Sequence, residues 1–290
     1  METNAKDLLK GQGAIFLCAF LWSTSGLFIK LISWHPVLIA GSRSLIAALF
    51  MRVLRHAINP KTPLKTGFGF WAGGICYALT MASFVIANKL TTSANAILLQ
   101  YSAPVWAAVL GWAFIREKPH WEHWCALAAV LGGMILFFRD GIASGHLAGD
   151  LLAVLSGILF GAQSVFLRMQ KNANPSDSLI FAHLICFIIS VPFIFTHTPL
   201  LSASSVFPVL FMGVIQIGCA SVLFSYGIRR VKAVQAMLSA MVEPVLNPVW
   251  VLLVTGEKPA AAALAGGAVI ITAVIASSLI GKRRIAAGSP

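Results

Sequence analysis

Residues 206–228 read VFPVLFMGVIQIGCASVLFSYGI, a run that contains no charged side chain. A transmembrane α-helix needs about 20 consecutive, mostly apolar residues, and this run is long enough. Runs of the same kind recur along the whole chain. The pattern therefore predicts a bundle of membrane-spanning helices rather than a soluble domain.

Ten runs qualify as spans, and the connections between them are short. They are Ala14–Ile32, Val37–Leu54, Gly67–Ala87, Thr91–Ile115, His123–Phe138, Leu151–Leu167, Leu179–Phe195, Val206–Ile228, Ala233–Thr255 and Ala260–Gly281. The period-2 alternation of an outer-membrane barrel is absent. No signal-peptidase motif ends the first run, so we interpret it as the first span and not as a leader.

The composition excludes most other classes of protein. Of the 290 residues, 58% are hydrophobic and 10% are charged, against about 25% charged residues in globular domains. A soluble enzyme, a disordered regulator and a disulfide-stapled secreted domain are all excluded. The five cysteines lie inside apolar runs, so we expect small buried hydrophobes and neither a disulfide framework nor a metal site.

The basic residues predict the orientation in the membrane. If the amino terminus is cytoplasmic, 16 of the 21 Lys and Arg residues fall on the cytoplasmic side. Four fall outside, namely Lys30, Lys89, Arg139 and Lys258, and Arg43 lies within the second span. Positive charge gathers on the cytoplasmic side of membrane proteins. We therefore expect ten spans with both termini in the cytoplasm, and the net charge of +12 does not point to a nucleic-acid partner.

The two halves of the sequence resemble each other. Phe84–Phe138 aligns with Phe224–Ser278 at an offset of 140 without a gap. Pro104-Val105 then falls on Pro244-Val245, and Glu117-Lys118-Pro119 on Glu257-Lys258-Pro259. The first span matches the sixth at an offset of 138, so that Ser25 falls on Gln163.

The repeat predicts two structural units, residues 1–143 and residues 144–290. Each holds five spans, an odd number, so the second unit enters the membrane from the opposite face. Inverted repeats of this kind are typical of transporters that work by alternating access, with the substrate site near the midplane between the repeats. We therefore expect an all-α polytopic membrane protein with ten transmembrane helices in two inverted five-helix repeats.

Several motifs carry a resemblance to a known family. Trp22-Ser23 in the first span, Arg43 in the second, and a Pro-containing fourth span closed by Glu117 resemble the drug/metabolite transporter superfamily. The resemblance covers about Gly13 to Gly281 and is nearest to the EamA-like branch, in particular its bacterial aromatic amino acid exporters. It implies export of amino acids across the inner membrane.

The sequence departs from the family pattern at one helix end. The family often ends these helices with Leu-Gly-Glu, whereas this chain has Ile115-Arg116-Glu117 and Thr255-Gly256-Glu257. Neither the first nor the sixth span contains an acid, although small multidrug exporters carry a Glu in the first span of the repeat. That difference favours amino acids and neutral metabolites over lipophilic cations.

Polar residues inside spans are costly and often functional. Glu243 lies mid-span before Pro244, and it could bind a substrate ammonium, carry a proton or support a helix kink. Arg43 could contact a substrate carboxylate or form a gate, and it could also snorkel outward or pair with backbone carbonyls. Gln100, Gln163 and Gln216 could bind a zwitterion, while the alternative for each amide is a hydrogen bond between helices.

These residues define the predicted site. It lies at the midplane and combines aromatic rings for an apolar side chain with amides and one acid for a zwitterionic head group. Its predicted members are Trp22, Ser25, Tyr77, Gln100, Tyr101, Gln163 and Glu243. The expected substrate is an amino acid with a large apolar or aromatic side chain.

Other functions are less well supported by the sequence. The spans contain no metalloprotease, serine hydrolase or nucleotide-binding motif, so we expect a transporter and not an enzyme, and no cofactor. A lipid-modifying enzyme without a known motif, or an exporter of other small metabolites or drugs, stays open. The expected partners are the small-molecule substrate and the lipid bilayer, and the sequence predicts no oligomeric state.

Overall fold

The computed structural model describes residues 5–24, 28, 32–58, 63–91, 93–138, 146–199, 201–255 and 261–286, and every regular element in these ranges is a helix. The helices follow one another without an inserted domain, as expected from the short connections. In chain order they are α1 (Ala5–Ser23), α3 (Pro36–Ile58), α4 (Phe68–Leu90), α5 (Ser93–Gln100), α6 (Ala103–Ile115), α7 (Trp121–Phe138), α8 (Leu147–Met169), α9 (Pro175–Thr196), α10 (Ala203–Phe211), η2 (Met212–Cys219), α11 (Ala220–Ile228), α12 (Ala233–Ala240), α13 (Val242–Thr255) and α14 (Ala261–Ala286).

Seven helical segments are long and apolar enough to cross a membrane in the described part of the chain. Shorter apolar helices over Trp121–Phe137 and Ala233–Leu246 accompany them. The chain is thus an integral membrane protein built of apolar helices. Helix α1 begins at Ala5, nine residues before the predicted start of the first span.

Two of the predicted spans are interrupted at the same place in the sequence repeat. The fourth is divided into α5 and α6 at Tyr101-Ser102, and the ninth into α12 and α13 at Met241. Each break precedes a proline of the second half-helix, Pro104 in α6 and Pro244 in α13. Proline lacks an N–H and clashes with the preceding turn, so a straight helix cannot continue through it.

Helix α6 ends at the position where the family pattern has glycine. Arg116 follows it with φ 55°, in the left-handed region. A residue with a Cβ is strained there by roughly 1–2 kcal/mol. Its amide nevertheless closes the last turn by donating to the carbonyl of Gly111, so the first repeat keeps the turn without the glycine.

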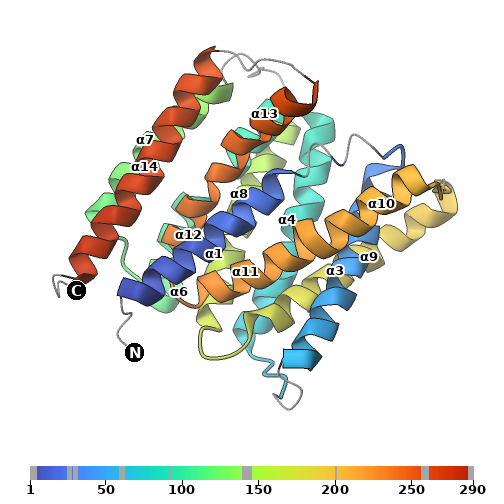
Figure 1. The fold of residues 1–290 in the computed structure, drawn as a ribbon, viewed down its shortest axis with the longest axis horizontal. Helices are drawn as coiled ribbons and strands as arrows, with labels where there is room; N and C mark the ends of the chain where they lie inside the picture. Colours follow the sequence, from blue (N-terminus) through green and yellow to red (C-terminus); the bar gives the residue numbers. More distant parts are fainter. Residues whose placement is uncertain are drawn as a thin grey trace.

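The packing of the helices has a two-fold pattern. Helix α7 packs on α14 at one edge of the bundle, and α3 packs on α9 at the other (Figure 1). Between the edges, α4 of the first half packs on α8 of the second half, and α11 of the second half packs on α1 of the first. Helix α1 begins and α14 ends on the same side of the bundle (Figure 1), which we name the termini face.

Glycines allow the closest of these contacts. A Cβ on Gly266 of α14 would lie 2.5 Å from the carbonyl oxygen of Gly133 and 2.6 Å from the backbone nitrogen of Phe137 in α7. Backbone atoms cannot move aside as a flexible side chain does. Gly132, next to Gly133, has nothing within 4 Å of its Cβ position and serves as a matched control.

We expect Gly266→Ala to lower the thermal stability of the detergent-purified protein, because overpacking a tight contact costs about 1–3 kcal/mol. Gly132→Ala should leave the melting temperature unchanged or raise it, since alanine is the better helix former by about 1 kcal/mol. Thermal unfolding followed by circular dichroism measures both. Equal melting temperatures for the two variants would show that the α7–α14 contact is looser than described.

Candidate functional site

The two helix interruptions are joined by a hydrogen bond. The hydroxyl of Tyr101, at the α5–α6 break, donates to Oε2 of Glu243, at the start of α13, over 2.8 Å. Interrupted helices at matching places in two repeats mark the substrate site in many transporters. An acid this deep in the apolar part of the chain also needs a partner. The Tyr101–Glu243 pair is therefore the centre of the candidate site.

A guanidinium lies within electrostatic range of this pair. Arg43 of α3 lies in the electrostatic neighbourhood of Glu243, and Tyr77 and Cys186 are close to it as well. Among the described residues, its Nε is buried without a hydrogen-bond partner. A buried cation that is not fully paired is unfavourable unless a ligand or water completes its hydrogen bonds. Arg43 is thus placed to receive an anionic group.

A histidine extends the polar cluster toward α11. The ring of Tyr77 packs edge-on against that of His183, with centroids 5.0 Å apart. Nε2 of His183 lies 3.1 Å from the hydroxyl of Ser221, while Nδ1 is buried and finds no partner among the described residues. Helices α3, α4, α9 and α11 therefore each contribute a polar side chain to one buried region.

Aromatic rings pack at the end of α1. The indole of Trp22 lies 5.6 Å from the ring of Phe224 and 6.2 Å from that of Phe160, measured between centroids. Gln163 lies one turn along α8 from Phe160, fully buried, and its Oε1 has no partner in the described part of the structure. Adjacent turns of one helix present their side chains to the same side, so Gln163 belongs to the Trp22 region.

The predicted site residues are thus only partly brought together. Tyr101 and Glu243 are in direct contact, whereas Tyr77 contacts His183 and lies only in the vicinity of Arg43 and Glu243. Gln100 instead donates to the hydroxyl of Ser156 in α8 over 2.8 Å, a hydrogen bond between helices. Ser25 lies outside the described residues.

Three further polar residues join the region without having been included in the predicted site. Arg43 and His183 are isolated in apolar sequence, and only the packing of α3 and α9 shows that they converge on Tyr77. Gln216 donates to the carbonyl of Trp22 over 3.3 Å. It lies in η2, a π-helical stretch, and such stretches are frequent at functional sites.

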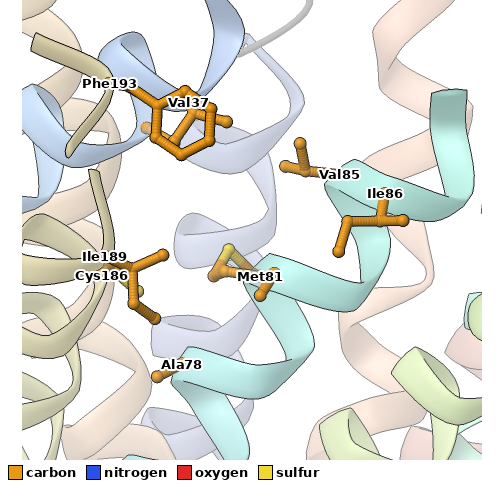
Figure 2. Close-up of a pocket in the computed structure, with 10 residues that line it drawn as sticks. Val37, Ala78, Met81, Val85, Ile86, Cys186, Ile189 and Phe193 are labelled. Atoms are coloured by element: carbon orange, nitrogen blue, oxygen red, sulfur yellow. The ribbon is translucent and has the colours of Figure 1, made fainter. Parts of the chain in front are cut away.

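An apolar pocket adjoins this polar cluster between α3, α4 and α9. Its volume is about 160 Å³, and its walls include Val37, Met81, Val85, Cys186 and Phe193. Figure 2 shows Val37 and Phe193 at one end and Ala78 at the other, with Met81, Cys186 and Ile189 between them. The lining presents almost no polar surface, so an apolar group is its natural occupant.

On the termini face, a network around one arginine connects three segments. Nε of Arg168, in the last turn of α8, donates to Oε1 of Glu117 over 2.7 Å. Arg168 also donates to the carbonyls of Ile228 and Arg229, at the end of α11. The other carboxylate oxygen of Glu117 accepts the amide N–H of Ala233, which begins α12. We name Glu117, Arg168 and the Ala233 amide the termini-face latch.

Other ion pairs and hydrogen bonds cross the same face. Arg55 pairs with Asp177, Arg284 pairs with Glu122, and Nζ of Lys232 lies 2.8 Å from Nε2 of His120. Burial, followed by the charge of Lys232, lowers the pKa of His120. The imidazole is therefore neutral at pH 7 and can accept a hydrogen bond from the ammonium.

The chemistry of the site suits an amphoteric ligand. Arg43 offers a charge-assisted donor for a carboxylate, and Glu243 offers an acceptor for an ammonium group. The described residues contain no group of three or more His, Cys, Asp or Glu side chains arranged to hold a metal ion.

Known proteins resemble this chain over most of its length. It is 25% identical to the "Uncharacterized transporter YwfM" of Bacillus subtilis, over 93% of this chain and 94% of that protein. It is 22% identical to the "Pseudopaline exporter CntI" of Pseudomonas aeruginosa, over 71% and 72% of the two chains. A solved crystal structure with 20% identity superposes with a TM-score of 0.81 over 97% of this chain and 99% of that one.

A family model matches the chain twice. The model of the EamA-like transporter family covers residues 9–139 and again residues 147–279. The two matches fall on the two copies of the sequence repeat, and the relatives' names are those of transporters and not of enzymes. With most of its length accounted for in this way, the chain belongs to the EamA-like transporter family.

Proposed function

We propose that the protein exports amino acids with large apolar or aromatic side chains, and related metabolites, across the inner membrane by alternating access. The observation that carries the proposal is the Tyr101–Glu243 hydrogen bond, which joins two matching helix interruptions within reach of Arg43. One acid and one guanidinium match the ammonium and the carboxylate of an amino acid. The neighbouring aromatic rings and the apolar pocket match its side chain.

Alternating access is supported by the relation between the halves. We propose ten transmembrane helices in two inverted repeats, residues 1–143 and 144–290. Helix α1 begins on the termini face, whereas its repeat partner α8 ends there with Arg168. The packing pairs α3–α9 and α7–α14 each join repeat-equivalent spans. Exchanging the conformations of two such halves would move the opening from one side to the other.

We infer the direction of transport and the class of substrate from the chemistry of the site and from the names of similar proteins. The name of the Pseudomonas aeruginosa relative describes an exporter of pseudopaline, which agrees with export of a small metabolite. Export of a metabolite other than an amino acid is the second candidate, because the names of the relatives do not specify amino acids. The same polar cluster would then bind another small molecule with an anionic group.

The first prediction concerns topology, with the termini face in the cytoplasm. Ser204, in the first turn of α10, and Thr66, before α4, are both exposed. In a chain whose native cysteines are replaced, Ser204→Cys should react with a membrane-impermeant maleimide on intact cells and Thr66→Cys should react only after lysis. The basic residues that gather on the termini face give the physical reason, and the opposite labelling pattern would invert the assignment.

The second prediction concerns Glu243. Glu243→Gln should lower uptake of an amino acid such as phenylalanine into proteoliposomes by at least about tenfold, since the loss of a single charged contact is enough for that factor. The folded yield should stay near that of the wild type. Glu122→Gln is the matched control, because Glu122 is also buried but pairs with Arg284 between α7 and α14. Wild-type uptake by a stable Glu243→Gln protein would remove Glu243 from the site.

The third prediction concerns the termini-face latch. Removing one partner of a buried ion pair costs about 3–5 kcal/mol, so Glu117→Ala should favour opening on this side. Ser164, one turn before Arg168 and fully buried, serves as the reporter. Alkylation of Ser164→Cys by a water-soluble maleimide should become at least about tenfold faster in the Glu117→Ala background. Asp7→Ala, in the first turn of α1 on the same face, removes an acid without breaking an ion pair described above and should not change the rate. An unchanged rate in the Glu117→Ala background would show that the latch does not control opening.

A further inference from the structure

Helices α3, α4 and α9 line the apolar pocket, and each of them carries a polar side chain just beyond one end of it. On α3, Val37 and Ala40 line the pocket, and Arg43 is one turn further along. On α9, Cys186 lines the pocket, and His183 is one turn toward the start of the helix. Residues three or four apart share a helix face, so both polar side chains lie beyond the same end of the pocket.

Helix α4 shows the same arrangement, with Tyr77 as its polar side chain. Ala78 and Met81 line the pocket, and Tyr77 directly precedes Ala78. Tyr77 packs edge-on against His183 and lies near Arg43 and Cys186. The end of the pocket marked by Ala78 in Figure 2, its inner end, is therefore the end nearest to Arg43, Tyr77 and His183 along their helices.

We propose that the α3–α4–α9 pocket binds the apolar group of a carboxylate-bearing substrate, whose carboxylate is held at the inner end by Arg43. This assignment rests on the proposed transport function and specifies how the site selects its substrate. Arg43 Nε and His183 Nδ1 are buried and lack partners among the described residues. Both can donate to a carboxylate, one as a cation and the other in its Nδ1–H tautomer.

The size of the pocket limits the group that fits. Its volume is about 160 Å³, and an apolar cavity of about 150 Å³ is large enough to bind benzene. A phenyl group or a branched aliphatic chain of similar size therefore fills it, while an indole would extend beyond its open side. Met81 narrows the pocket between its two ends (Figure 2). Methionine is flexible and adapts to irregular neighbours, which makes Met81 a determinant of the accepted size.

A lipid tail is the competing occupant, since Ile86 and Ile189 of the wall are exposed on the outer surface of the bundle. A lipid acyl chain has no polar group that could bind a guanidinium at the inner end of the pocket. The carboxylate-bearing substrate accounts for both the apolar walls and the unpartnered nitrogen of Arg43. The two occupants differ in whether binding depends on a carboxylate.

Binding can be measured without transport through the native thiol of Cys186, which lies in the pocket wall. In a chain that keeps only this cysteine, we expect 3-phenylpropanoate to slow alkylation by N-ethylmaleimide at least about fivefold, and acetate to have no effect. Arg43→Gln should abolish this protection, whereas Lys65→Gln, at an exposed position outside the site, should preserve it. No protection by 3-phenylpropanoate, or equal protection by toluene and 3-phenylpropanoate, would overturn the assignment.

Selectivity gives the second test, in proteoliposomes supplied with alanine, phenylalanine or tryptophan. Ala78→Leu, or the milder Ala82→Leu, should lower uptake of phenylalanine relative to alanine at least about tenfold by filling the pocket. Met81→Ala should raise uptake of tryptophan relative to phenylalanine. Leu79→Phe, on the exposed side of α4, should leave all ratios unchanged.

The two tests separate the subsite from the transport function. Uptake by the wild type with unchanged ratios in all the pocket variants would reject the subsite and leave the transport function standing. Protection of Cys186 by 3-phenylpropanoate without uptake of any amino acid would support the subsite and reject the proposed amino acid transport. Both outcomes are read on the full-length protein.

Discussion

The hydrogen bond between Tyr101 and Glu243 links the two places where the helical framework is interrupted. In the apolar part of a membrane protein, a carboxyl group and a broken helix each leave polar groups that water cannot satisfy. Bringing the two breaks together lets one repeat satisfy the polar group of the other. The α7–α14 and α3–α9 edges can then be tightly packed, since the unfavourable groups are gathered between them.

Arg43 connects this constraint to function. Its charge interacts with Glu243, yet its Nε stays without a partner in the described structure. A site that satisfied all of its own hydrogen bonds would have little free energy left for a ligand. The incompletely satisfied arginine and histidine next to an apolar pocket therefore fit a carrier that binds its substrate and must also release it.

The termini-face latch shows how the repeats are held together away from the site. Glu117 comes from the segment 9–139 of the family match, while Arg168 and Ala233 come from the segment 147–279. Both charged side chains of the latch are largely buried. The latch is thus an ionic contact between the two halves that is costly to break by removing one partner.

The membrane class and the helical architecture could be predicted from the sequence, because apolar runs of about 20 residues can cross a bilayer only as helices. The family could be predicted from its motifs and from the repeat. The sequence also predicted Glu243 and Tyr101 as members of the site, from their depth in apolar runs, from their chemistry and, for Glu243, from the proline that follows it. Three features could be seen only in the tertiary structure. They are the hydrogen bond from Gln100 to Ser156, the π-helical stretch that carries Gln216, and the convergence of Arg43 with His183. A helical sequence fixes the spacing of side chains along one face, but the neighbour that each face meets depends on the packing of helices far apart in the chain.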